Sequence, residues 1–506
     1  MAQSISILGL AASDPVPGLY ADLRFGAGVA TGSGASRTLV LMGNMLSTGS
    51  ATVDSVEYGP DTAVQLATES DAIALFGSGS ELHRMYRRAA GSNPVTPIYA
   101  VAVTESVGSK ASATLTLSGT ATSAGSLRVW VCGEFVDVGF ITGDGYAAVG
   151  DLAVTAINAH AEWPVTASHT TGSASLVLTA KQRGLRGNWL RYGAQVIPST
   201  CGISVSPTSF GFMTGVTTAD SNTAALATLA TKNHYYQVSA AEDVTQFDAL
   251  SDQIATMQEP ITGIRQRCFA GSVDTISNVI TVATTVNNPR AEIVWLAQSD
   301  VPPSELAALA ASAYALEEAS TVPLCNFNGY GGSARTASHW PVRRPLSQAA
   351  PTRAQVKSAL NNGVTPVQVS SNGSTSIVRR ITSYSLNGSN QDLRVRDTCK
   401  VTVPDFWTDD FLAIVASVIE GKNIANDPVD QEPVPANCVT PRDIKILSNK
   451  LVRDYAANGL IDNPGEVIAN TICIREANPS NRISILIPLR IGDIVNQIGI
   501  RVEQVS

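Results

Sequence analysis

The chain has 506 residues, of which 44% are hydrophobic, 15% charged and 6% aromatic. At about 150 residues per domain this length corresponds to three or four domains, and the apolar share argues against wholesale disorder. The 34 basic and 42 acidic residues give a net charge of −8. Because proteins that grip nucleic acid usually present a basic face, the charge gives no sign of a nucleic-acid partner, and we expect none.

The cysteines and the apolar segments limit where the chain works. Seven cysteines are dispersed and never spaced Cys-x-x-Cys, which indicates reduced thiols and no zinc site. The first basic residue is Arg24, so the N-terminus lacks the basic segment of a signal peptide. The longest apolar runs, Ile98–Val103 and Phe411–Ile419, are too short to cross a bilayer. We expect a soluble protein without membrane insertion.

Residues 1–36 are predicted to form an N-terminal arm. After the turn residues Asp14–Gly18, apolar and polar side chains alternate with the period of a strand. A Gly/Ser/Ala-rich segment, Gly26–Ser36, then predicts a flexible hinge. The residues of the alternating stretch that matter below are Leu19, Tyr20, Ala21, Leu23 and Phe25.

The next segments predict an α/β core that is interrupted by a β-rich insertion. Residues 37–103 contain a strand at Thr38–Met42 and a helix with Ser80 as N-cap. From residue 104 to 123, ten of twenty residues are Ser or Thr, and residues 104–215 carry six basic and six acidic residues. A hairpin around Gly133-Glu134 and a helix at Val149–Ala161 are expected there.

After residue 215 strands and helices alternate, which predicts a largely parallel sheet covered on both faces. Residues 326–372 are loop-rich, and a second α/β unit is expected after them. The expected strands are Tyr235–Val238, Cys268–Ala270, Ile293–Leu296, Ile377–Tyr384, Val467–Glu476 and Arg482–Leu489, and the expected helices are Val244–Met257, Ser304–Ala319, Phe406–Ile419 and Pro441–Gly459.

The last residues again alternate, with Ile498, Ile500 and Val502 on one face of a predicted strand. The predicted fold is therefore α/β (α+β) and multi-domain, with a largely parallel α/β core, an inserted β-rich domain and extended strand arms at both ends. The expected divisions are 1–36 (N-terminal arm), 37–103 (first part of the core), 104–215 (inserted outer domain), 216–372 (core), 373–490 (C-terminal α/β domain) and 491–506 (C-terminal arm).

The sequence contains only weak matches to catalytic or ligand-binding motifs. There is no P-loop, no His-Glu-x-x-His and no Gly-x-Ser-x-Gly elbow. Gly143–Ala148 fits a loose dinucleotide fingerprint, but a tight turn is favoured because its strand belongs to a hairpin. Arg343 and Arg344 fit an acidic partner or a phosphate, with a solvated loop as the simpler interpretation. We expect no catalytic, cofactor-binding or metal-binding residue, and no enzyme.

The five histidines, at positions 83, 160, 169, 234 and 339, never lie three or four residues apart. They therefore present no pair of metal ligands on one helix, and structural histidines are favoured. Spacing leaves a Ser/His/Asp triad open, since triads assemble in space. The two terminal strands are also open to two interpretations, pairing within their own sheet or addition to the sheet edge of a neighbouring subunit.

Twelve stretches, in order along nearly the whole chain, share one resemblance. They are Val16–Tyr20, Arg37–Gly43, Leu75–Leu82, Asn93–Val103, Ala156–His160, Trp163–Ala167, Leu178–Asn188, Leu360–Pro366, Ile377–Tyr384, Val439–Pro441, Gly459–Asn463 and Asn478–Arg482. In this order they resemble the tail sheath proteins of contractile-tailed, Mu-like bacteriophages. The most visible departure is the Pro-rich link Asp427–Asn437.

The resemblance implies a structural virion protein with no cofactor. Sheath subunits form rings, usually hexameric, that stack helically around a tail tube in a metastable extended state. A baseplate signal triggers contraction, which drives the tube through the host envelope for genome ejection. The implied partners are further copies of the chain, the tail tube protein, and the baseplate and tail terminator proteins. Such a protein is made and assembled in the host bacterial cytoplasm.

Family sheaths link subunits by strand addition from both arms. The resemblance therefore makes the terminal strands inter-subunit arm contacts, formed by Leu19, Tyr20, Ala21, Leu23, Phe25, Ile498, Ile500 and Val502. Two alternatives remain. One is the sheath of a phage-derived contractile machine of the bacteriocin or secretion type. The other is a hydrolase, since the family core has been called subtilisin-like in shape.

Overall fold

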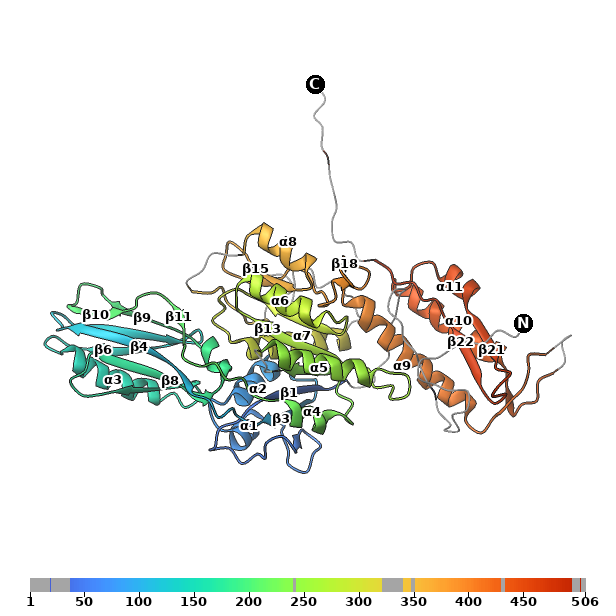
Figure 1. Cartoon of the computed structure of the whole chain (residues 1–506), viewed down its shortest axis with the longest axis horizontal. Helices are drawn as coiled ribbons and strands as arrows, with labels where there is room; N and C mark the ends of the chain where they lie inside the picture. Colours follow the sequence, from blue (N-terminus) through green and yellow to red (C-terminus); the bar gives the residue numbers. More distant parts are fainter. Residues whose placement is uncertain are drawn as a thin grey trace, which may run out of the picture.

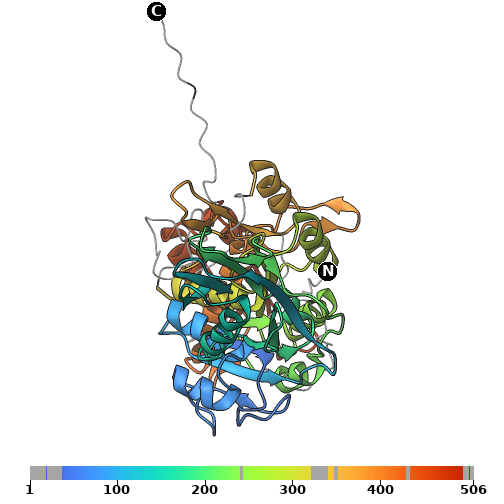
Figure 2. The ribbon, with the colours of Figure 1, turned by 90° about the vertical axis from the view of Figure 1, so that its left-hand side faces the viewer.

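The computed structural model describes residues 19, 37–239, 243–320, 340–346, 351–428, 433–493 and 501. They form three regions along the longest axis of the molecule, with residues 104–215 at one end, the α/β core in the middle and the segment from Cys399 at the other end (Figure 1). Figure 2 views the molecule from the first of these ends, with the core behind it. No helix among the described residues is long and apolar enough to cross a membrane.

The core is built on an eight-stranded sheet in the order β16-β15-β14-β13-β12-β1-β3-β2. Neighbours from β15 to β3 pair in parallel, and the two outermost strands are antiparallel. Every residue of β1, β3 and β14 is buried, as expected for a parallel sheet covered on both faces. The strands are β1 Leu39–Asn44, β2 Glu57–Tyr58, β3 Ile98–Val103, β12 Tyr236–Ser239, β13 Arg267–Ser272, β14 Ala291–Trp295, β15 Thr365–Val369 and β16 Thr375–Ile377.

Two hydrophobic clusters fill the two faces of this sheet. Because side chains alternate along a strand, Leu39 and Leu41 of β1 pack into one cluster, and Val40 and Met42 pack into the other. The first cluster includes α1 Glu69–Phe76, α2 Glu81–Ser92 and α7 Pro303–Ser320, and the second includes α4 Thr223–Leu229, α5 Val244–Met257, α6 Ile276–Val286 and α8 Arg353–Asn361.

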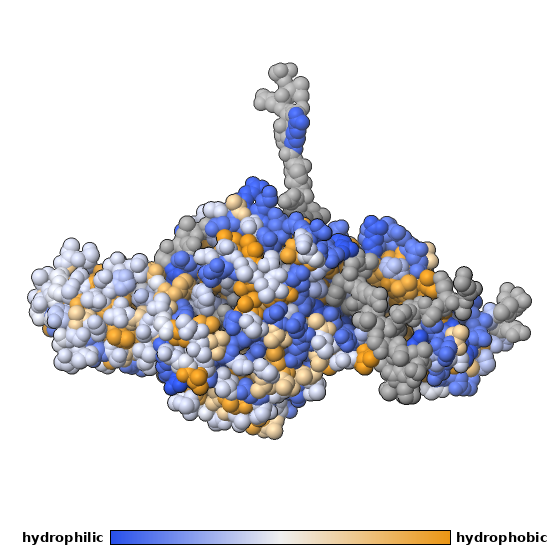
Figure 3. All heavy atoms as spheres, in the orientation of Figure 1, coloured by the Kyte–Doolittle hydropathy of each residue, from blue (hydrophilic) through white to orange (hydrophobic). Residues whose placement is uncertain are grey.

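Residues 104–215 form two antiparallel four-stranded sheets, in the orders β10-β4-β8-β7 and β11-β9-β5-β6. Buried and exposed residues alternate along β4, so one face packs inward and the Ser/Thr face points out. The surface is accordingly pale in Figure 3. The domain has its own buried cluster, from Ala111 to Val216. Its elements are β4 Lys110–Gly119, β5 Gly125–Val131, β6 Glu134–Phe140, α3 Tyr146–Asn158, β7 Val165–His169, β8 Ser175–Arg183, η1 Leu185–Trp189, β9 Arg191–Ile197, β10 Ile203–Ser206 and β11 Gly211–Phe212.

The C-terminal region has a fourth buried cluster, between two long helices and a two-stranded ribbon. Trp407 and Phe411 stack on one another, 4.8 Å between ring centroids, on the face of α9 that meets α10. Thr440 closes a capping box with Asp443 at the start of α10. The elements after β16 are β17 Leu386–Asn387, β18 Asn390–Gln391, α9 Cys399–Ile419, β19 Asn423–Ile424, β20 Cys438–Val439, α10 Pro441–Ala457, α11 Pro464–Asn470, β21 Ile472–Arg475 and β22 Ile483–Leu486.

The mixed α/β class is as predicted, but several elements differ from the sequence-based expectation. The strand expected at Ile377–Tyr384 is wrong beyond Ile377, because Arg380 turns inward to the buried carboxylates of Glu292 and Glu318. The β15–β16 hairpin spans the boundary expected after residue 372, so the core sheet continues past it. The loop-rich stretch also contains α8 and β15.

Two further corrections concern turns. The strand expected at Val467–Glu476 begins only at Ile472, because residues 464–470 form α11. Pro464 occupies the first position of this helix, which it favours. The β5–β6 hairpin turns at Cys132-Gly133, one residue earlier than expected. Both residues have positive φ, 49° and 84°, as a type I′ turn requires.

Candidate functional site: an open ribbon and two charged joints

Most predicted arm contacts lie outside the described residues. Of them only Leu19 is described, and it is 41% exposed. Tyr20, Ala21, Leu23, Phe25, Ile498, Ile500 and Val502 stay predictions.

The ribbon of β21 and β22 has room for further strands. Its register pairs Ile472 with Leu486 and Cys473 with Ile485. Cys473 and Ile485 pack onto the C-terminal core, whereas Leu486 is 49% exposed. Neither strand has a second neighbour among the described residues. Because a two-stranded ribbon is marginal in water, its outer edges suit additional strands.

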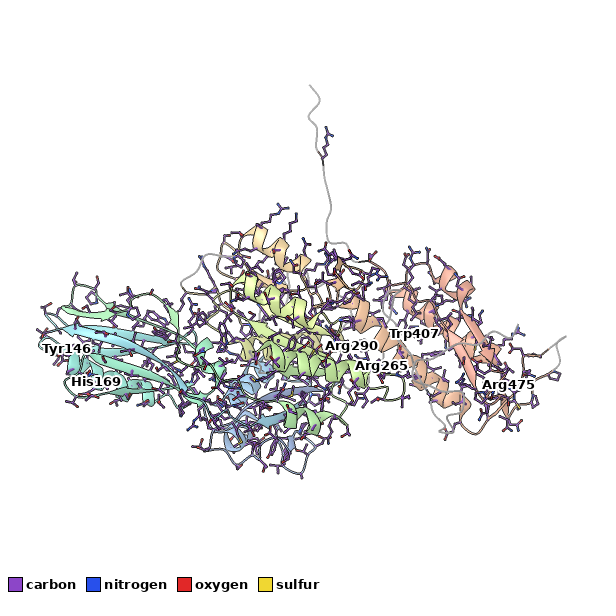
Figure 4. All side chains as sticks on the ribbon, in the orientation of Figure 1. Tyr146, His169, Arg265, Arg290, Trp407 and Arg475 are labelled. Atoms are coloured by element: carbon purple, nitrogen blue, oxygen red, sulfur yellow. The ribbon has the colours of Figure 1, made fainter. Side chains whose placement is uncertain are left out.

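The core sheet is a poor acceptor by comparison. Its two outermost strands, β2 and β16, contain two and three residues. Short edge strands are a common way to block edge-to-edge pairing. The open edges of the ribbon lie at the far end of the molecule, where Figure 4 labels Arg475.

The joint between the core and the C-terminal region is a buried charge network. Asp405 of α9 accepts two hydrogen bonds from the guanidinium of Arg290, at 2.8 and 2.7 Å. Both side chains are fully buried, and the Tyr235 hydroxyl donates to the same carboxylate at 2.8 Å. Burial alone would raise the pKa of Asp405, but the nearby guanidinium groups of Arg290, Arg37 and Arg265, with Arg290 the largest contributor among them, together lower it. Figure 4 shows Arg290 and Arg265 beside α9.

One helical turn further along α9, Asp409 binds two more arginines. Arg37 donates to it at 2.7 Å, and Arg265 donates at 3.1 Å. The guanidinium of Arg37 also lies over the rings of Tyr235 and Phe406, at 3.6 and 3.8 Å. Burial alone would lower the pKa of Arg37, yet Tyr235 and Asp409 raise it, so the cation is firmly held.

Near its start, α9 also binds the segment that leads to the C-terminal arm. The ammonium of Lys400 donates to the Asp493 carboxylate at 2.7 Å and to the Ile491 carbonyl at 3.2 Å. The hydrogen bond from Lys400 lowers the pKa of Asp493. The amide of Gly492 donates to the Leu460 carbonyl at 3.1 Å, so this segment is fixed on two sides.

The joint between the core and the inserted domain uses similar groups. Arg186 of η1 forms ion pairs with Glu81 of α2 and with Asp220, which follows the insertion. Asp220 also accepts from the amide of Ser106 at 2.5 Å. A cavity of about 10 Å³, enough for one water, lies between these elements. Two further pairs flank the joint, the partly exposed Arg87–Glu134 at 3.1 Å and the largely buried Arg191–Asp300 at 3.0 Å.

The candidate chemical motifs have structural explanations. Gly145 is the N-cap of α3, and the preceding strand β6 is antiparallel to β5, so Gly143–Ala148 is not part of a β-α-β unit. Tyr146, in this turn, and His169 both lie in the inserted domain, far from the core (Figure 4). Arg343 lies in an isolated bridge with Ser374.

The described histidines each pair with a carboxylate, His83–Glu69, His160–Glu162, His169–Asp151 and His234–Glu57, and His339 lies outside the described residues. Within the part of the chain that the structure describes, no three His, Cys, Asp or Glu residues are grouped as metal ligands.

One larger cavity, of about 70 Å³, lies at the carboxyl end of β13. This is the usual place for ligands in an α/β sheet. Its two carboxylates are already engaged, since Asp243 accepts from the Thr245 amide and Asp274 from the Thr275 amide. Most of its other lining is apolar, including Phe247, Val279 and Ile293, and no Lys, Arg or His is among the lining residues.

We compared the chain with protein families, with curated proteins and with solved structures. No family model matches the chain. The Mu-like prophage FluMu tail sheath protein of Haemophilus influenzae is 23% identical over 498 residues, which cover 96% of each protein. The predicted resemblance to Mu-like tail sheath proteins is confirmed.

Three solved structures of sheath proteins are partly similar in shape to the chain. The sheath tail protein of Listeria innocua has a TM-score of 0.43 at 12% identity, covering 86% of this chain and 87% of that one. The sheath tail protein of Desulfitobacterium hafniense has a TM-score of 0.44 at 12% identity, covering 90% and 96%. The contracted helical sheath of the anti-feeding prophage has a TM-score of 0.47 at 10% identity, covering 97% and 99%.

Proposed function

We propose that the chain is the structural subunit of a contractile phage tail sheath and that its arms add strands to neighbouring subunits. The observation that carries the proposal is the similarity to a tail sheath protein over 96% of both chains. The two-stranded ribbon with open edges supports the proposed strand addition, because it offers edges to which an arm strand can pair. The core sheet, which ends in two short strands, does not offer such edges.

In this proposal the extended sheath is kinetically trapped, and each subunit has two discrete arrangements of its interfaces. Hexameric rings stack around the tail tube, and the baseplate and tail terminator bound the two ends. The chain works in the virion after assembly in the host cytoplasm. The proposed subunit has no catalytic role.

Electron microscopy of the purified protein tests the proposal. We expect helical tubes from the full chain. Removal of residues 1–25 or 497–506 should leave a folded subunit, because the four buried clusters lie outside these segments, but should abolish stable tubes. Pro at Leu23 or Ile500 should act similarly by removing one ladder donor. Compact monomers from the full chain, or normal tubes from the double truncation, would contradict the proposal.

A matched control uses the inserted domain. Gly139 faces open space on β6, so Gly139→Ser should leave both folding and tubes unchanged. A sheath from a phage-derived machine would behave identically in these assays. Capsid genes beside the gene of this chain distinguish a phage from such a machine.

A further inference from the structure

Both ends of the described body are fastened to the same helix. Arg37, which follows the predicted N-terminal arm, is ion-paired with Asp409 of α9. Asp493, near the start of the predicted C-terminal arm, is ion-paired with Lys400 of α9. The two α9 residues are nine positions apart, about 13 Å along a helix.

Each of these two ion pairs lies between an arm and the first backbone hydrogen bonds that tie the chain to the body. Arg37 precedes β1, whose pairing with β3 and β12 begins at Leu39. Tension along the N-terminal arm therefore meets the Arg37 side chain, held by Asp409 and by two aromatic rings, before it meets the core ladder. At the other end, tension meets the Lys400–Asp493 pair before the bridge between Ile461 and Ile491.

A third contact keeps α9 from leaving the core. The dry, bidentate pair between Asp405 and Arg290 lies between the two fastenings along the helix. Bidentate guanidinium–carboxylate pairs combine strength with a fixed geometry. The N-terminal half of α9 is thus seated on the core and holds both arm roots, at Lys400 and at Asp409.

We propose that α9 is the tension link of the subunit, with Arg37 and Lys400 as its positioning residues. Force from one neighbour enters at one arm, runs along α9 and leaves at the other arm. The core sheet and the inserted domain are then relieved of most of that force. The inference rests on the proposed function, because it assumes that both arms are held by neighbours.

The first test compares contraction of assembled sheaths. Arg37→Ala, Lys400→Ala and the double variant should still form tubes, because the arms themselves are intact. When contraction is triggered, we expect several-fold more broken sheaths by electron microscopy, and most from the double variant. Arg87→Ala removes a similar, partly exposed ion pair at the insertion joint and should break no more often than the unmodified chain.

The second test needs no sheath. A single subunit is pulled by its two ends in optical tweezers. We expect the first rupture force to fall in Arg37→Ala and in Lys400→Ala, and to stay unchanged in Arg87→Ala. Arg37→Lys keeps the charge but loses the forked guanidinium contact and its stacking on the aromatic rings. Its first rupture force should therefore lie between those of Arg37→Ala and the unmodified chain.

The outcomes separate the two ideas. If the unmodified chain forms no tubes, the proposed function fails, and the pulling experiment still decides the role of α9. If tubes form and all variants contract intact with unchanged rupture forces, the tension link is wrong. Should Arg37→Ala not fold, Asp409→Asn removes the same pair with little change of shape, and equal rupture forces there would also overturn the inference.

Discussion

The two joints of this molecule use the same side chains in different ways. At the C-terminal joint, Asp405 and Arg290 are fully buried and share one bidentate geometry. At the insertion joint, the single cation of Arg186 serves two carboxylates beside a water-sized cavity. A dry bidentate pair has one low-energy arrangement, whereas a shared cation with room for water has several. The first joint is therefore suited to holding an orientation, and the second to tolerating small rotations.

The largest expected effect is at the C-terminal joint. Asp405→Ala leaves the buried guanidinium of Arg290 without its carboxylate, which typically costs about 3–5 kcal/mol. We expect the free energy of unfolding to fall by that amount in urea titrations, with early hydrogen exchange in α9. Replacing both partners, Asp405→Leu with Arg290→Met, should recover most of the loss. A loss below about 1 kcal/mol for Asp405→Ala would remove the contrast between the joints.

The insertion joint should be more tolerant. Arg186→Met leaves Glu81 and Asp220 without their cation, but Glu81 lines the neighbouring cavity, where water can hydrate it. We expect a loss of about 1–3 kcal/mol, seen as faster hydrogen exchange in η1 and α2 with α9 unaffected. If Arg186→Met lowered the free energy of unfolding as much as Asp405→Ala does, water would not reach the insertion joint and the contrast between the joints would be wrong.

Acid should act on the two joints with opposite sign. The pKa of Asp405 is lowered below 3.8, so its stabilising contribution is complete above that value and is lost as the pH falls through its folded pKa. The pKa of Asp300, which faces Arg191 at the insertion joint, is raised above 3.8 by burial. Its folded form binds a proton more tightly, so stability rises as the pH falls from its folded pKa towards 3.8.

Hydrogen exchange followed region by region on acidification measures this difference. Exchange near η1 should slow slightly before exchange near α9 accelerates. In Asp300→Asn the first change should disappear, while the second remains. Parallel acceleration in both regions from the start would contradict the assignment.

The smallest expected effect lies inside the inserted domain, away from both joints. Gly145 is the N-cap of α3, with no side-chain cap and open space around it. Gly145→Ser supplies a cap, which should stabilise the domain by a few tenths of a kcal/mol. Thermal unfolding of the inserted domain in the variant and in the unmodified chain measures this gain in stability. A loss of stability would indicate that Gly145 is held for another reason.

Much of the fold could be predicted because the apolar periodicity is local. The strand Ile98–Val103, the helix Val244–Met257 and the Ser80 N-cap match the structure. One error arose where a distant charge decides the backbone. The predicted strand after Ile377 does not form because Arg380 bonds Glu292 and Glu318, which lie 88 and 62 positions away. No local window contains that information.

The same limit applies to the site. The arm residues stay predictions, and the charged joints were missed altogether. One signal was present in the sequence, since Asp405 and Asp409 are four residues apart in a largely apolar helix and must share a face. What the sequence could not supply is their partners, because Arg37, Arg265 and Arg290 come from separate parts of the core.

The contact between Ser106 and Asp220 bears on whether the inserted domain can be replaced by another domain. It joins the positions where the chain leaves the core and returns to it, so the two crossing segments lie one hydrogen bond apart. A module of almost any size fits between such closely placed ends, since the cost of closing a longer loop grows only slowly with its length. The body therefore offers a natural site for displaying a foreign domain, and a graft would have to replace Arg186, which pairs with both Glu81 and Asp220.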